Sequence, residues 1–152
     1  MEAATIGRFP GKKKGAVSIA CLGPLAGDAP TRRAAALAQL DVLVDLFDRG
    51  LCEPLPLYCK TSAAWAEAVP AKRMQACSDV WEPQSEFATP ENREPEHQLV
   101  LGGVVPLGEL LAAFPGPGET GDGWAGGEPT RFGRYALRLW SGLLDAEDVR
   151  DR

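Results

Sequence analysis

The chain has 152 residues, of which 45% are hydrophobic and 24% are charged, and its formal net charge is −5. This length and composition predict one globular domain, residues 1–152, without a membrane span. The net negative charge argues against a protein that binds nucleic acid by itself, because neutralising phosphates requires a basic surface.

The N-terminal region predicts a short strand after a basic turn. Lys12, Lys13 and Lys14 precede the apolar run of residues 16–22, in an order that superficially resembles a signal peptide. The run is short and bounded by glycines, so we expect a buried strand and no secretion. Two interpretations of the lysines stay open: a weak contact with DNA phosphates, or a charged entry to the strand that discourages edge pairing.

The clearest helix covers residues 31–48. Thr31 is its candidate N-cap, with Asp28 as a competitor, and Gly50 predicts a left-handed stop. Apolar residues recur at helical spacing along one side and predict a face that packs on the sheet. The core residues expected from this face are Leu37, Leu40, Val44 and Phe47.

The stretch "LCEPLPLYCKTSAAWAEA", residues 51–68, predicts a connector followed by a short helix. Its prolines remove backbone donors and restrict the residues before them, so the preceding helix cannot continue. We expect Thr61 or Ser62 to cap the next helix, a break at Val69-Pro70, and another helix over residues 71–81.

Loops and short elements make up the rest of the chain. We expect, in order, a solvated loop at 82–98, a short strand at 99–105, a helix at 106–114, a flexible loop at 115–130 and a helix from 131 capped by Thr130. The last helix has an apolar face that predicts Leu139 and Trp140 in the core.

Metal-dependent nuclease chemistry would need an acidic residue two positions before a lysine on one strand. The residues two positions before Lys12, Lys13, Lys14, Lys60 and Lys72 are Pro10, Gly11, Lys12, Tyr58 and Pro70. None of these is acidic, so we expect no nuclease centre in this chain.

Other catalytic and cofactor motifs are equally unpromising. The G-x-G-x-x-G pattern at residues 116–121 lies in a Pro-Gly loop instead of at a strand-to-helix turn. The four cysteines lack the paired spacing of a zinc site and fit a reduced cytoplasmic protein. His97 is the only histidine and lies in a Glu-rich segment, an unlikely scaffold for a positioned base. We therefore expect no catalytic, cofactor-binding or metal-binding residues.

Two longer stretches carry a resemblance to a known family. They are "LDVLVDLFDRGLCEPLPLYCKTSAAWAEA" (residues 40–68) and "RFGRYALRLWSGLLDAED" (residues 131–148), with "HQLVLGG" and "ELLAAF" between them in the expected order. Over roughly residues 8–148 the sequence resembles the last part of RecC, the gamma subunit of exodeoxyribonuclease V, especially in its actinobacterial form. No catalytic motif contributes to this resemblance.

The resemblance implies an α/β fold, a restriction-endonuclease-like (degenerate PD-(D/E)XK nuclease-like) domain with a small central sheet flanked by helices. It implies a C-terminal fragment of a much larger RecC-like subunit, acting as a non-catalytic scaffold and partner-docking domain of the cytoplasmic RecBCD helicase–nuclease in double-strand-break repair and homologous recombination. The nuclease and helicase activities would reside in partner subunits.

The implied partners are RecD-like and RecB-like subunits and the rest of RecC, with DNA reached through the assembled complex and with no membrane or small-molecule substrate. Affinity concentrates in a few desolvated aromatic or arginine anchors. Trp65, Trp81 and Trp124 belong least to a predicted core stripe and are the candidate partner contacts. The alternatives are a stand-alone degenerate nuclease with residual metal binding, or an unrelated protein-interaction domain.

Overall fold

The computed structural model describes residues 7–10, 17–23, 25–85 and 87–151. Its internal contacts divide the chain into two compact units, Met1–Val44 with Gly142–Arg152, and Asp45–Ser141. Lys12, Lys13 and Lys14, the predicted phosphate contacts, lie outside the described residues.

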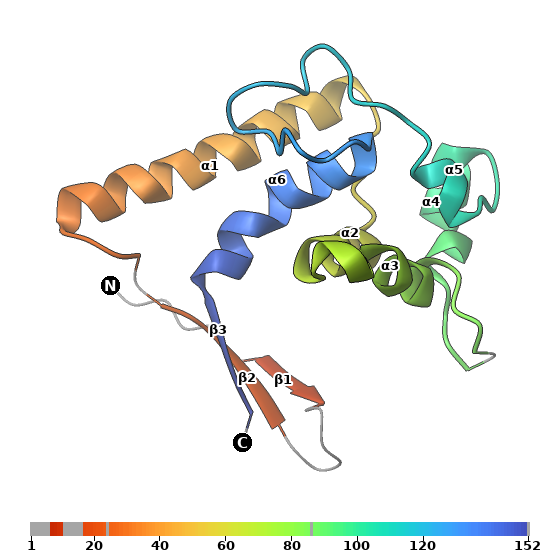
Figure 1. Ribbon diagram of the computed structural model, residues 1–152, viewed down its shortest axis with the longest axis horizontal. Coiled ribbons are helices and arrows are strands. Elements are labelled where there is room, and N and C mark those ends of the chain that lie inside the picture. Colours follow the sequence, from red (N-terminus) through yellow and green to blue (C-terminus); the bar gives the residue numbers. More distant parts are fainter. Residues whose placement is uncertain (1–6, 11–16, 24, 86, 152) are drawn as a thin grey trace. The chain divides into compact units, whose positions relative to one another are not determined.

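The described elements are mainly helical (Figure 1). In chain order they are β1 (Gly7–Pro10), β2 (Val17–Leu22), α1 (Ala29–Cys52), α2 (Cys59–Glu67), the 3₁₀ turn η1 (Pro70–Lys72), α3 (Arg73–Trp81), the 3₁₀ turn η2 (Glu91–Arg93), α4 (Pro95–Leu101), α5 (Leu107–Leu110), α6 (Arg131–Ala146) and β3 (Glu147–Asp151). Among the described residues, none of these helices combines the length and hydropathy needed to cross a bilayer.

The first unit contains a three-stranded antiparallel sheet in the order β1-β2-β3 (Figure 1). Its middle strand, β2, confirms the strand predicted at residues 16–22, and Ile19 pairs with Arg8 on one side and Arg150 on the other. The restriction-endonuclease-like fold and the single-domain organisation remain predictions.

Helix α1 confirms the predicted helix but not its burial. Asp28, not Thr31, caps its start, since the Thr31 N–H donates to Asp28 Oδ1 at 3.0 Å. Gly50 is inside the helix, which continues to Cys52, so the predicted left-handed stop is wrong. The four residues expected in the core are also exposed: Leu37 (48%), Leu40 (53%), Val44 (50%) and Phe47 (66%).

The burial of these residues was mispredicted because a helical period specifies less than burial. A repeat of 3.6 residues places side chains on one side of a helix, but it does not state that another element covers that side. In α1 only Leu46 is buried. The apolar side of the helix is therefore a surface within the described structure.

The second unit holds the hydrophobic core, which is largely aromatic. Helices α2 and α3 lie side by side (Figure 1). The buried core residues are Tyr58, Trp65, Cys77, Trp81, Leu107, Leu110, Phe132 and Ala136. Trp65 meets Phe132 edge to face at 5.7 Å between ring centroids, and Tyr58 meets Trp81 in the same way at 4.8 Å. Leu139 and Trp140, also predicted in the core, are only half-buried.

Several predictions for the connecting segments are wrong. The strand expected at residues 99–105 is replaced by the end of α4, which stops at Gly102 in a left-handed conformation (φ 75°). The segments expected to be solvated loops, 82–98 and 115–130, contain the buried carboxylates Glu91, Glu119 and Glu128. A charged composition predicted exposure, whereas hydrogen-bond donors elsewhere in the unit make burial tolerable.

The start of helix α6 confirms the predicted cap. The N–H of Gly133 donates to Thr130 Oγ1 at 3.0 Å, as an N-cap requires. A Cβ at Gly133 would come too close to the Glu128 carboxylate and the Thr130 hydroxyl, so a larger residue there would require these side chains to move. The predicted break at Val69-Pro70 is also confirmed, because α2 ends before it and η1 begins at Pro70.

Candidate functional site

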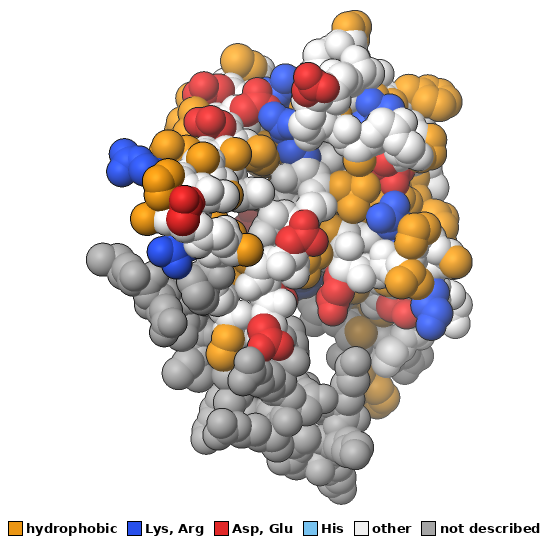
Figure 2. Space-filling view, turned by 60° about the vertical axis from the view of Figure 1, so that its left-hand side comes forward, with side chains coloured by type: hydrophobic (Ala, Val, Ile, Leu, Met, Phe, Trp, Pro, Cys, Tyr) orange, Lys and Arg blue, Asp and Glu red, His pale blue; other side chains and the backbone are white. Residues whose placement is uncertain are grey.

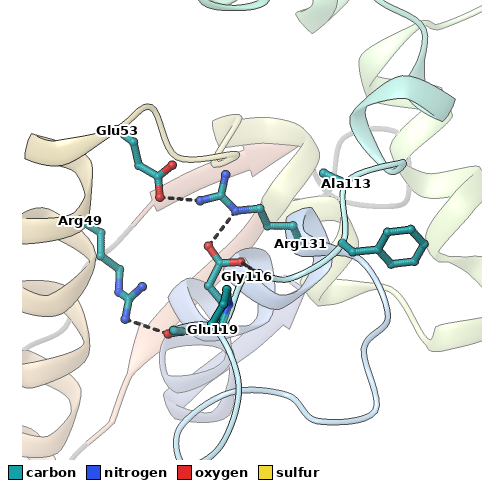
Figure 3. Close-up of a pocket in the computed structure, with 9 residues that line it drawn as sticks. Arg49, Glu53, Ala113, Gly116, Glu119 and Arg131 are labelled. Carbon is teal, nitrogen blue, oxygen red and sulfur yellow. Dashed lines mark hydrogen bonds and ion pairs between the residues drawn. The ribbon is translucent and has the colours of Figure 1, made fainter.

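The second unit contains a pocket whose centre is the buried carboxylate of Glu119. Glu119 Oε1 accepts hydrogen bonds from Arg131 Nε at 2.7 Å and from the Tyr135 hydroxyl at 2.9 Å, while Oε2 accepts from the Gly116 N–H at 2.8 Å. Figure 3 shows Arg131 extending between Glu119 and Glu53, to which it donates a second bond at 2.6 Å. Short bonds of this kind to ionised groups are strong.

The pocket has a volume of about 480 Å³. Arg49 stands on one side, donating to the Gly118 carbonyl at 3.0 Å (Figure 3). The Phe114 side chain, 84% exposed, contributes an apolar part of the lining. The pocket thus combines ion-paired side chains with one exposed aromatic ring, a combination more typical of a docking surface than of an enzyme cleft.

The electrostatics of the pocket hold its carboxylate ionised. Burial alone would raise the pKa of Glu119, but the hydrogen bonds from Gly116, Arg131 and Tyr135 outweigh it, and the pKa lies below its ordinary value. Burial, followed by the hydrogen bond to Glu119, raises the pKa of Tyr135. Glu119 is therefore held ionised by three donors, so it has no proton to give as a general acid.

Two arginines enclose Trp124, the third tryptophan predicted to contact a partner. The Cζ atoms of Arg49 and Arg138 lie 5.2 and 4.5 Å from its ring centroid. Asp45 accepts hydrogen bonds from both guanidinium groups, at 3.1 Å from Arg49 and 2.8 Å from Arg138. Trp124 is half-buried, so part of its surface remains available.

The other two candidate partner contacts lie in the core. Trp65 is 6% exposed and donates its indole N–H to Glu128 at 3.2 Å. Trp81 is fully buried and donates to the Val105 carbonyl at 3.0 Å. Both rings are part of the aromatic core of the second unit, so neither is exposed for contact with a partner. Partner contact through Trp124 stays a prediction.

A set of acidic and histidine side chains that sequence reasoning dismissed also comes together in the second unit. Glu91, Glu94 and His97 offer ligand atoms that lie within 4.8 Å of one another. Their three-residue spacing was the available signal, but the Glu-rich composition of the segment pointed to a solvated loop. Among the described residues these are the side chains able to hold a metal ion.

Exposed apolar side chains form the second surface of interest, which belongs to the first unit. We call it the α1 apolar face: Leu37, Leu40, Leu43 and Val44, each 48–53% exposed. Figure 2 shows hydrophobic side chains at the surface, interspersed with charged ones. Side chains of this type contribute binding free energy when a partner removes them from water.

Comparisons with known proteins show which proteins this chain is similar to. The family model described as "RecC C-terminal domain" matches residues 15–70. The RecBCD enzyme subunit RecC of Mycobacterium tuberculosis (strain H37Rv) is 39% identical over 116 residues, covering 73% of this chain and 10% of that protein. The RecBCD enzyme subunit RecC of Mycolicibacterium smegmatis is 38% identical over 117 residues, covering 71% and 10%. The chain spans about a tenth of the length of these curated relatives. No solved structure matches it.

Proposed function

We propose, from the premise that this chain belongs to the RecC C-terminal domain family, that it is a non-catalytic scaffold and partner-docking domain of a RecBCD-type helicase–nuclease. The proposal includes a cytoplasmic role in double-strand-break repair and homologous recombination. It also includes a degenerate nuclease-like fold, a RecD-like subunit as the direct partner, and DNA reached through the assembled complex, with RecB-like and other RecC segments beside it.

The observation that carries the proposal is the α1 apolar face. Its four side chains are each about half exposed, and covering the remainder would contribute about 1 kcal/mol per side chain. An apolar stripe of this kind marks a surface that another protein segment covers. A partner or another part of a RecC-length subunit can supply that segment.

A second observation supports the absence of catalysis. The lysines lack an acidic residue two positions earlier, so the usual arrangement of carboxylate and ammonium around a metal-bound water is missing. The buried carboxylates Glu119 and Glu128 accept three and four hydrogen bonds, respectively, from donors of the second unit itself. Carboxylates held by this many donors stabilise the fold.

A pull-down with the cognate RecD-like subunit tests the docking role. The variant Leu40→Ser with Leu43→Ser should lose about 2 kcal/mol of binding free energy, a rise in Kd of about 30-fold. The matched control, Asp41→Ser with Asp48→Ser, changes exposed polar residues of the same helix and should bind like the unaltered chain. Failure of the unaltered chain to bind at micromolar concentration would contradict the proposal.

A nuclease assay tests the absence of catalysis separately. The purified 152-residue chain, incubated with linear duplex DNA and Mg²⁺, should leave the DNA intact. Cleavage that copurifies with the chain through two orthogonal columns and disappears with EDTA would contradict the non-catalytic assignment and favour a degenerate nuclease with residual activity.

A further inference from the structure

Glu91, Glu94 and His97 form a compact arrangement of three donor groups between two helices of the second unit. Glu91 belongs to η2, Glu94 precedes α4, and His97 is in the first turn of α4. The segment runs along the start of α2, because the N–H groups of Lys60 and Thr61 donate to Glu91 Oε1 and Oε2 at 2.8 and 2.7 Å. The three side chains therefore converge where two chain segments meet.

The histidine nitrogen that faces the carboxylates has no hydrogen-bond partner. His97 Nε2 is buried, and lies 3.3 Å from Glu94 Oε2 and 3.7 Å from Glu91 Oε1. These distances permit an ion pair with a protonated ring, yet neither contact has the geometry of a hydrogen bond. A buried polar atom without a partner carries a free-energy penalty, and an ion bound to its lone pair removes that penalty.

The separations fit a shared metal ion. With bonds of about 2.0–2.2 Å and tetrahedral angles, two zinc ligands lie about 3.3–3.6 Å apart. The separation between His97 Nε2 and Glu94 Oε2 is already within that range, and the one to Glu91 Oε1 exceeds it by a small amount. The three ligand atoms together lie within 4.8 Å of one another, so the longest separation must shorten before the ligands surround a tetrahedral ion.

Surrounding groups orient the three ligands. Glu91 is 1% exposed and held by two backbone N–H groups and the Thr61 hydroxyl, at 2.5 Å. Glu94 uses its other oxygen to accept from Lys60 Nζ at 2.5 Å. The His97 ring stands edge to face on Tyr58, with 4.8 Å between centroids. Hydrogen-bonded carboxylates and a packed imidazole are the outer-shell support that metal ligands require.

Charge also favours a cation here. The carboxylates of Glu91 and Glu94 both lie beside His97, and the one ammonium paired with them is that of Lys60, which contacts Glu94. A dication uses the nitrogen lone pair and both carboxylates together.

We propose that Glu91, Glu94 and His97 bind a Zn²⁺ ion, with a water in the fourth position. The ion joins η2 to the start of α4, while Glu91 keeps its hydrogen bonds to the start of α2. One nitrogen and two oxygen ligands suit zinc, and neutral imidazole is its commonest protein ligand. This site is independent of the α1 apolar face, so the docking proposal and the zinc proposal can fail separately.

Calorimetric titration of the metal-free 152-residue chain with Zn²⁺ tests the site. We expect one equivalent to bind and the melting temperature to rise with it. His97→Gln should weaken binding at least about 100-fold, since even an outer-shell change loses about 10–100-fold. Glu94→Gln, at a partly exposed position, should weaken it too, and Glu96→Gln, at an exposed neighbour, should bind normally. Far-ultraviolet circular dichroism establishes that each variant is folded.

Co²⁺ substitution separates this site from the cysteines. We expect the visible absorption of a low-coordinate ion without sulfur-to-metal charge-transfer bands, because the ligands are nitrogen and oxygen. Binding should weaken at acid pH, where protons compete for the ligands. No binding at millimolar Zn²⁺, binding unchanged in His97→Gln, or a thiolate spectrum would each overturn the proposal.

Discussion

Replacement of Glu119 by Gln tests whether the Glu119 carboxylate stabilises the second unit through its three hydrogen bonds. The substitution keeps the shape of the side chain and removes its charge. Both Arg131 Nε and the Tyr135 hydroxyl donate to Oε1, whereas the Gly116 N–H donates to Oε2. A glutamine has one acceptor oxygen and one donor nitrogen, so it cannot accept all three bonds.

The expected loss follows from either orientation of the amide. If the amide oxygen replaces Oε1, the amide nitrogen faces the Gly116 N–H and that donor loses its partner. If the amide is flipped, its nitrogen faces Arg131. One bond to a charged group is worth about 1.5–3 kcal/mol, and an unpaired donor adds to the loss, so we expect the free energy of unfolding to fall by about 2–4 kcal/mol. Arg131 retains Glu53, which keeps the loss below that of an isolated buried charge.

The effect should depend on pH in a definite direction. The folded-state pKa of Glu119 lies below its ordinary value, because its donors outweigh burial. Its contribution is then fully present above the unfolded-state pKa of about 4.3, and it is lost as the pH falls through the folded-state pKa. The stability difference between the original chain and Glu119→Gln should be largest at pH 7 and should shrink below about pH 4.

Urea unfolding at pH 7 and at pH 3.5, followed by tryptophan fluorescence, measures both quantities. Glu67→Gln is the matched control, because Glu67 is exposed at the end of α2 and its replacement should change stability by less than about 0.5 kcal/mol. A loss below about 1 kcal/mol at pH 7, or a difference that grows as the pH falls, would refute the proposed role of the carboxylate.

Three further outcomes are expected of the second unit. Trp81→Ala should lower the free energy of unfolding by about 3–5 kcal/mol in a urea titration, because Trp81 is fully buried, whereas Phe87→Ala, at a fully exposed ring, should not. Burial raises the pKa of the Cys77 thiol to about 12, so iodoacetamide at pH 8 should modify the exposed Cys59 and spare Cys77, as read by mass spectrometry. Thr130→Ala should destabilise the chain by about 1–2 kcal/mol through loss of the α6 cap, measured by thermal unfolding.

Local sequence signals predicted the position of several elements. The apolar repeat of residues 31–48 indicated α1, and the short apolar run of residues 16–22 indicated β2. Thr130 marked the start of α6, because its short hydroxyl can reach a backbone N–H one turn ahead. The Val69-Pro70 pair marked the end of α2. Each of these signals acts within one turn or one strand, where the residues concerned are neighbours in sequence.

Burial depended on partners far away in sequence, and there the predictions failed. Glu91 accepts hydrogen bonds from the N–H and the hydroxyl of Thr61, which is 30 residues away in sequence. The residues near Glu91 therefore did not indicate that its charge would be compensated. Cys59 starts α2 without a local side-chain cap, because Glu91 supplies the cap instead. Glu91, Glu94 and His97 are close in sequence, and there the Glu-rich composition of the segment, which pointed to a solvated loop, concealed their convergence.

The two kinds of misjudged side chain differ in one respect that bears on function. The buried carboxylates accept hydrogen bonds from donors inside the second unit, and these bonds stabilise the folded chain. The leucines of the α1 apolar face are half exposed, and their exposed apolar surface adds nothing to the stability of the fold. On the proposed function, that difference separates the residues that build the domain from those that join it to an assembly. The stability of the chain should then depend on Glu119 and Trp81, and its association should depend on Leu40 and Leu43.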